Sequence, residues 1–105
     1  MTLQINGHLL EGCVLAVLSQ GDEYGYSLTQ RVKNELHVSE STLYPVMRRL
    51  QTNECLTTYD LPHNGRNRRY YRITEQGAAQ HRACMDAWQD FKGRIDGILL
   101  EGALQ

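Results

Sequence analysis

The sequence feature that most constrains the fold is a pair of strand-like segments set among patterns of helical spacing. Residues 56–61 and 69–73 are rich in β-branched and aromatic side chains, which favour strands. The stretch between them, residues 62–68, is basic and contains Asn64-Gly65, a pair typical of the tight turn of a β-hairpin. The sequence therefore predicts a β-hairpin whose connecting loop carries positive charge.

Two helical patterns begin the chain, and in each the apolar residues recur at intervals of three and four. The first covers about residues 4–20 and ends at residues 21–23, Gly-Asp-Glu, which interrupt the pattern. The second opens at residues 24–27. Its apolar stripe consists of Leu28, Val32 and Leu36.

A third helix is predicted between this stripe and the hairpin. Ser39 or Ser41 supplies its N-cap, because a serine hydroxyl accepts a hydrogen bond from the free N–H groups of a first turn. Pro45 is tolerated if the helix begins near Thr42, whereas a start near Ser39 predicts a kink. The inward face comprises Leu43, Val46, Met47 and Leu50, and the outward face carries Arg48 and Arg49.

The last pattern predicts a long helix over about residues 75–100, capped by Thr74. Its apolar residues are spaced by four and three positions in turn, which makes a seam about two heptads long. They are Cys84, Trp88, Phe91, Ile95 and Ile98, with Leu99 beside them. A seam of this kind favours packing against a second copy of the chain, and the alternative is a helix folded back on its own core.

This order of elements predicts a winged helix-turn-helix: an α+β, mostly helical fold with three helices, a β-hairpin wing and a long C-terminal dimerisation helix. Residues 1–74 form the predicted DNA-binding region and residues 75–105 the dimerisation helix, within one compact domain. The third helix has the right size to enter a major groove. A basic wing can hold the phosphate backbone or enter the minor groove.

The charge distribution agrees with an anionic partner, although the formal net charge is only −1. Eight basic and four acidic residues between Arg31 and Arg72 give +4, and the rest of the chain carries −5. Such a block suits a local polyanion, and the alternative is a solvated basic face. The predicted DNA contacts are Tyr26, Ser39, Ser41, Thr42, Tyr44, Arg48, Arg49, Arg66, Asn67, Arg68 and Arg69.

The tyrosines divide between packing and contact. Tyr24 is predicted to pack at the junction of the first two helices, and Tyr26 to bond a phosphate rather than pack. Tyr70 and Tyr71 are neighbours on one strand, so they point to opposite faces. One of them is therefore expected in the core and the other exposed.

Other classes of protein find little support. Three widely separated cysteines argue against a disulfide framework, and the apolar runs are too short to cross a bilayer, so we expect a cytoplasmic protein. No G-x-S-x-G, glycine-rich loop or H-E-x-x-H motif is present, so we expect no enzyme and no cofactor. His81 and Cys84 alone make a poor zinc site, and no metal is expected.

Three segments resemble the PadR family of bacterial repressors. Residues 15–18, with Gly21 and residues 24–26, resemble the family's first-to-second helix junction. Residues 41–45 with 48–50 resemble its recognition helix, and residues 68–77 resemble its second wing strand and the start of its last helix. The short C-terminal region is similar to the subgroup that has a single final helix.

The resemblance implies a homodimeric repressor of a nearby gene that binds a two-fold-symmetric operator and is released by a small molecule. The last helix is then expected to pack on its partner and on the partner's first helix, which adds Leu9 to the interface. Trp88 is either core or one wall of a pocket for a planar aromatic or apolar effector. The other residues predicted for that pocket are Met85, Cys84, Phe91, Leu15 and Glu11.

Two alternatives to a repressor remain at this stage. A winged helix can serve as a protein-interaction module that does not bind DNA. The chain can also be a drug-binding scaffold that has lost its operator. The dependence of duplex binding on salt separates the first alternative from DNA binding.

Overall fold

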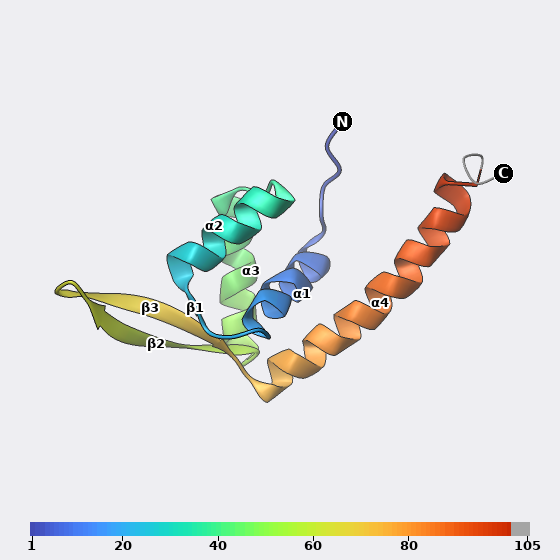
Figure 1. The fold of residues 1–105 in the computed structure, drawn as a ribbon. Helices are drawn as coiled ribbons and strands as arrows, with labels where there is room; N and C mark the ends of the chain where they lie inside the picture. Colours follow the sequence, from blue (N-terminus) through green and yellow to red (C-terminus); the bar gives the residue numbers. More distant parts are fainter. Residues whose placement is uncertain (102–105) are drawn as a thin grey trace.

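The computed structural model describes residues 1–101 of the 105 and confirms the predicted winged helix-turn-helix (Figure 1). Residues 102–105, the end of the predicted dimerisation region, lie outside the described residues. The helices and strands, in chain order, are α1 Gly7–Leu18, β1 Glu23–Tyr24, α2 Gly25–Leu36, α3 Glu40–Thr52, β2 Leu56–His63, β3 Arg66–Ile73 and α4 Glu75–Leu99.

Side-chain caps set where three of the helices begin. The Asn6 carboxamide oxygen accepts a hydrogen bond from the Leu9 N–H at 2.8 Å, so α1 starts three residues later than predicted. Thr74 caps α4 in the same way, as the sequence predicted, and Ser39 rather than Ser41 caps α3. Because α3 begins at Glu40, Pro45 lies well inside a continuous helix.

The hairpin is longer and tighter than predicted. Residues 62–63 and 66–68, expected in a loop, belong to β2 and β3, and only Asn64 and Gly65 turn the chain. Both have positive φ, 51° and 78°, which is the geometry of a type I′ turn. The basic residues of the wing therefore lie on a regular strand rather than on a flexible loop.

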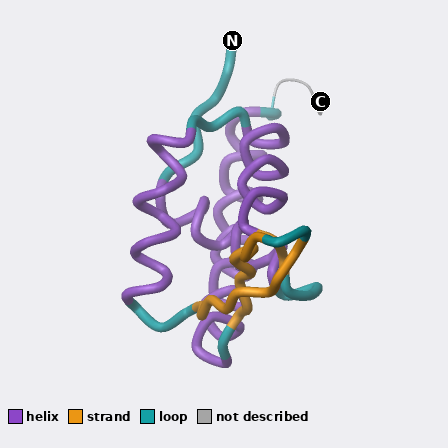
Figure 2. The backbone as a smooth tube through the Cα atoms, turned by 90° about the vertical axis from the view of Figure 1, so that its left-hand side faces the viewer, coloured by secondary structure: helices purple, strands orange, loops and turns teal. Residues whose placement is uncertain are grey.

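A third strand was missed. Residues 23–24, predicted to end a helix break and open α2, form the short strand β1, which pairs antiparallel with β3 in the order β1-β3-β2. Tyr24 thus joins the wing to the beginning of α2, where it is the residue before the first helical turn. Figure 2, viewed from the side of the wing, shows the strands in front of the lower part of the helices, with the N-terminus at the top.

The core lies between the first three helices and the base of the wing. Leu10, Leu18, Leu28, Leu43 and Leu50 are each almost fully buried, and the last three lie on the apolar faces predicted for the second and third helices. Leu15 is also completely buried in this cluster. Its predicted role as a wall of an effector pocket is wrong, because its place on α1 faces the core.

The N-terminal half of α4 packs against α1, and the rest of α4 extends away from the body of the molecule (Figure 1). Gly12 allows the close approach, since a Cβ there would lie 2.9 Å from the Cβ of Cys84. Beyond this crossing the apolar seam is open: the exposed fractions of Phe91 and Ile98 are 53% and 80%. No helix within residues 1–101 is both long and apolar enough to cross a membrane.

Candidate functional site

The exposed face of α3 carries most of the residues predicted from its sequence. Ser41, Thr42, Tyr44 and Arg48 are exposed, whereas the apolar residues between them are buried. This division follows from the helical period, which separates the two sets by about half a turn. Ser39 has a local role, because its hydroxyl accepts from the Thr42 N–H at 3.2 Å and lies 2.9 Å from the Ser41 hydroxyl.

The wing places its basic side chains on both faces of β3. The Arg68 guanidinium lies 4.5 Å from the centre of the Tyr24 ring, a cation–π contact that fixes its direction. Arg69 points to the other face and lies 3.7 Å from the Asp60 carboxylate. Arg66 and Asn67, next to the turn, are exposed.

A hollow of about 290 Å³ joins the three elements that carry predicted contacts. Tyr26 at the start of α2, Tyr44 on α3 and Arg69 on β3 all line it. These residues are far apart in the chain, and β1 and the core bring them to one surface. Tyr26 is 65% exposed, so its hydroxyl is free to meet a partner.

An aromatic cluster covers the other face of the sheet. Tyr70 stacks on Tyr59 with ring centres 5.6 Å apart and contacts Tyr24 at 5.9 Å. Tyr70 is therefore half-buried instead of exposed, while Tyr71 packs partly against the core. The prediction of opposite faces is confirmed, but the prediction that one tyrosine is exposed is wrong, because neighbouring rings cover it.

Asp22 anchors this cluster to the loop before β1, and sequence reasoning missed it. Its carboxylate accepts hydrogen bonds from the Tyr59 hydroxyl at 2.6 Å and from the Arg72 guanidinium at 2.9 and 3.0 Å. These bonds, the one from Tyr59 first, lower the pKa of Asp22 below its ordinary value. Arg72 is thus neutralised at the base of the wing.

Arg49 does not share the direction of Arg48. Its guanidinium forms an ion pair with Glu11 on α1, so it points toward α1 and α4 and away from the face that carries Tyr44. The sequence could not show this, because the residues that attract Arg49 come from elements distant in the chain.

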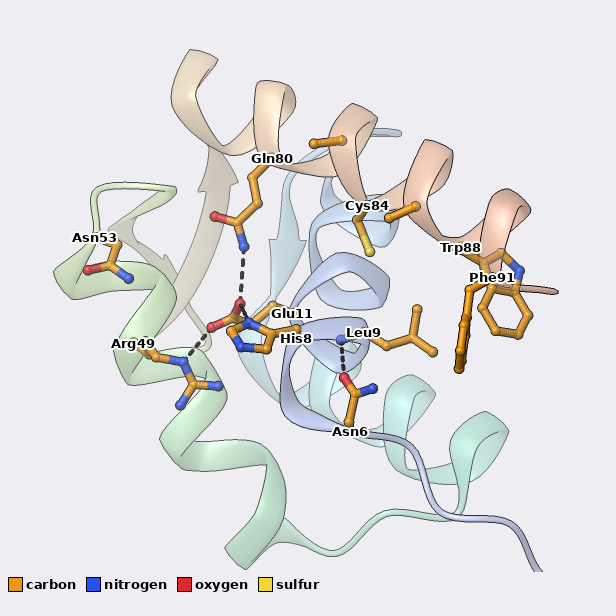
Figure 3. Close-up of a pocket in the computed structure, with 12 residues that line it drawn as sticks. Asn6, His8, Leu9, Glu11, Arg49, Asn53, Gln80, Cys84, Trp88 and Phe91 are labelled. Carbon is orange, nitrogen blue, oxygen red and sulfur yellow. Dashed lines mark hydrogen bonds and ion pairs between the residues drawn. The ribbon is translucent and has the colours of Figure 1, made fainter. Parts of the chain in front are cut away.

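A pocket of about 730 Å³ lies between α1, α3 and α4 (Figure 3). Trp88, Phe91 and Cys84 form an apolar wall, as predicted, and Glu11 with Arg49 forms a polar wall opposite. The remaining lining residues are Asn6, His8, Leu9, Asn53, Gln80, Ala83 and Ala87. Sequence reasoning missed Asn6, His8, Asn53 and Gln80, which have no pattern of their own.

Met85, also predicted for this pocket, lines a second hollow instead. That hollow measures about 890 Å³, lies between the N-terminal segment and α4, and shares Trp88 and Phe91 with the first. The two seam aromatics therefore line both apolar spaces.

The cysteines show no activated thiol. Burial raises the pKa of Cys13, Cys55 and Cys84 above the ordinary value of a thiol. Within residues 1–101 no group of three or more histidine, cysteine or acidic side chains is placed to hold a metal ion.

The chain is similar in sequence to a known family and to a curated protein. Residues 14–83 match the model of the Transcriptional regulator PadR-like family, a span that includes all three strands, the whole of α2 and α3, and parts of α1 and α4. A protein of Lysinibacillus sphaericus, described only as uncharacterized, is 36% identical over 93% of both chains.

Two solved structures are similar over most of their length. The protein smu.1704 of Streptococcus mutans is 36% identical with a TM-score of 0.85, over 94% of this chain and 93% of that one. A PadR-like transcriptional regulator of Bacillus cereus is 30% identical with a TM-score of 0.77, over 87% and 91%.

Proposed function

This chain belongs to the PadR-like family of transcriptional regulators, which bind DNA and are not enzymes, and we propose that it is a sequence-specific repressor acting as a homodimer. A regulator of this kind must reach the DNA of the cell, so we propose that it is cytoplasmic. The observation that supports a direct DNA contact is the surface shared by Tyr26, Tyr44 and Arg69.

In the proposed complex α3 enters the major groove. Ser41, Thr42, Tyr44 and Arg48 face the DNA, where hydroxyls bond phosphates or base edges and arginine can bond guanine. The wing follows the adjacent backbone. Its contacts are Arg66, Asn67, Arg68 and Arg69, with Tyr26 bonding a phosphate beside α2. We assign capping to Ser39 and leave Arg49 out of the contacts.

The dimer follows from the open seam of α4. Trp88, Phe91, Ile95, Ile98 and Leu99 are exposed in the single chain, and burying them against a second copy removes a large apolar surface from water. Cys84 continues this surface along α4 to the crossing with α1, and Leu9 extends it onto α1. A two-fold dimer presents two copies of α3 to a pseudo-palindromic operator with half-sites about one helical turn apart.

Release by a small molecule is the third part of the proposal. Trp88 is 41% exposed on the wall of the larger apolar spaces, so a planar aromatic ligand can stack on its indole. Phe91, Cys84 and Glu11 line the first space and Met85 the second. Because α4 also carries the dimer seam, a ligand there can change how two copies of α3 are spaced.

Selection of bound duplexes from a random pool, using the purified protein, tests the DNA partner. We expect a two-fold-symmetric consensus and affinity that falls steeply with salt, because each neutralised phosphate releases counterions. A flat dependence on salt with no duplex retained would instead support a protein-interaction module. A scaffold that binds aromatic ligands but selects no duplex would support the lost-operator alternative.

A pair of variants tests the wing. Replacing Arg68 and Arg69 together by alanine is expected to abolish DNA retention and to leave the dimer intact, because two phosphate contacts are lost. The control is Arg82→Ala, which removes an exposed charge from α4. Retention of the double variant at wild-type strength would remove the wing from the mechanism.

Tryptophan emission tests the effector, since Trp88 is the single tryptophan. A panel of planar aromatic compounds is expected to change its emission and, at the same concentrations, to release DNA. If some other inducer releases DNA while these compounds leave the emission unchanged, the stacking proposal fails.

A further inference from the structure

Glu11 is the one charged side chain that is buried among the described residues, with 4% of it exposed. Burying a carboxylate costs free energy unless hydrogen bonds and opposite charge compensate it. Both oxygens of Glu11 are compensated. One accepts from the Arg49 guanidinium and the other from the Gln80 amide at 3.1 Å, with the His8 ring 3.7 Å away.

These partners come from different elements (Figure 3). Glu11 lies on α1, Arg49 on α3 and Gln80 on α4. The side-chain amide oxygen of Gln80 in turn accepts a hydrogen bond from the Cys55 thiol at 3.1 Å. Cys55 directly precedes β2. A continuous polar chain therefore joins the DNA-facing helix to α1, to the helix of the proposed dimer seam and to the base of the wing.

We propose that Glu11 is a positioning residue for DNA binding, which holds α3 against α1 and α4 through Arg49 and Gln80. Arg49 then supports DNA binding without touching DNA. Two observations carry this. The guanidinium points away from the face of Tyr44, and its charge is already paired with a carboxylate that cannot leave the interior cheaply.

The inference rests on DNA binding by the family and refines the proposed contact surface. Arg48, one residue away and exposed on the outward face, provides the matched comparison. Removing a phosphate contact lowers the salt slope by about one, whereas tilting a helix weakens binding and leaves the number of neutralised phosphates unchanged. Affinity and salt slope together therefore separate contact from positioning.

The test is a double-mutant cycle of Glu11→Gln and Arg49→Gln, with DNA affinity measured over a range of salt and Arg48→Gln as the contact control. We expect each cycle variant to weaken binding by about 2- to 150-fold, with an unchanged slope. The double variant should be no weaker than the worse single variant, because both break the same pair. Glu11→Asp should restore part of the affinity.

Three results would overturn the inference. One is additive loss with a lower slope for Arg49→Gln, which makes Arg49 a DNA contact. Another is tighter binding by Glu11→Gln, which means that Glu11 withholds Arg49 from DNA. The third is wild-type binding by both single variants. Circular dichroism and sedimentation confirm that each variant is folded and keeps the wild-type oligomeric state.

Failure of this inference is distinct from failure of DNA binding itself. If the wild-type protein selects no duplex, the proposed repressor function fails and the cycle is not needed. If the wild-type protein binds an operator and the cycle gives additive effects, only the role of Glu11 is wrong.

Discussion

Gly77, in the first turn of α4, allows the helix to pass close to the backbone before β2. A Cβ at this position would lie 3.0 Å from the Cys55 carbonyl carbon and 2.9 Å from a side-chain carbon of Ile73. The backbone cannot rotate away as a side chain can. We expect Gly77→Ala to destabilise the fold by about 1–3 kcal/mol, measured by denaturant unfolding.

Gly93 is the matched control on the same helix. No atom lies within 4 Å of a Cβ built there, and the position falls outside the heptad seam. Because alanine has a higher helix propensity than glycine, Gly93→Ala is expected to stabilise the protein by up to about 1 kcal/mol. Equal effects of the two substitutions would show that packing at Gly77 contributes nothing.

Asp22 gives the wing a dependence on pH. Its pKa is lowered by the hydrogen bonds from Tyr59 and Arg72, so its ionised form stabilises the fold above the unfolded value, about 4. This stabilisation is lost as the pH falls through the lower folded pKa. We expect Asp22→Asn to lower Tm near pH 7 and the difference from wild type to shrink as the pH falls below the unfolded value and through the lower folded pKa. A constant difference would contradict this role.

Single residues were predictable where the signal is local. The cap Thr74 follows from its place before a helical pattern, and the structure confirms it; of the two serines predicted as caps of α3, the structure selects Ser39. Leu15 and Arg49 were not predictable, because their neighbours depend on how α1 meets the core and α3. The sequence alone leaves the direction of each of these side chains open, and the tertiary packing determines it.

At the scale of elements, the turn of the wing is the point of greatest constraint. Gly65 has φ of 78°, a conformation that is strained for a residue with a Cβ. No atom lies within 4 Å of a Cβ built at this position, so the effect of an alanine there is purely conformational. We expect Gly65→Ala to cost about 1–2 kcal/mol and to increase hydrogen exchange in β2 and β3. Unchanged exchange would show that the type I′ turn is not needed for pairing.

The hairpin register illustrates both the reach and the limit of sequence reasoning. Once Asn64 and Gly65 form a two-residue turn, the pairing of Tyr59 with Tyr70 follows by counting outward from it. The aromatic stack was therefore within reach of the sequence. The strand β1 was not, because two residues carry no periodicity and they pair with β3 only after the chain has folded.

At the scale of the whole molecule, the seam of α4 sets the oligomeric state. Ile98 is 80% exposed in the single chain, and burying it in both copies would contribute several kcal/mol. We expect Ile98→Lys to raise the dimer dissociation constant about a hundredfold or more, measured by sedimentation. Gln89→Lys, outside the seam, is the control. A monomeric wild-type protein at micromolar concentration would end the dimer proposal.

The crossing at Gly12 and Cys84 lies in the N-terminal half of α4 and acts as a fulcrum for the longer C-terminal part of the helix. About 15 residues extend past Cys84, which is about 22 Å of helix. A rotation of about 10° at the fulcrum moves the far tip by about 4 Å, which is about a tenth of the roughly 34 Å between successive turns of a duplex. A single methyl group added at Gly12 would therefore be amplified along α4. In the proposed dimer it would change the spacing of the two copies of α3, which must enter two major grooves together.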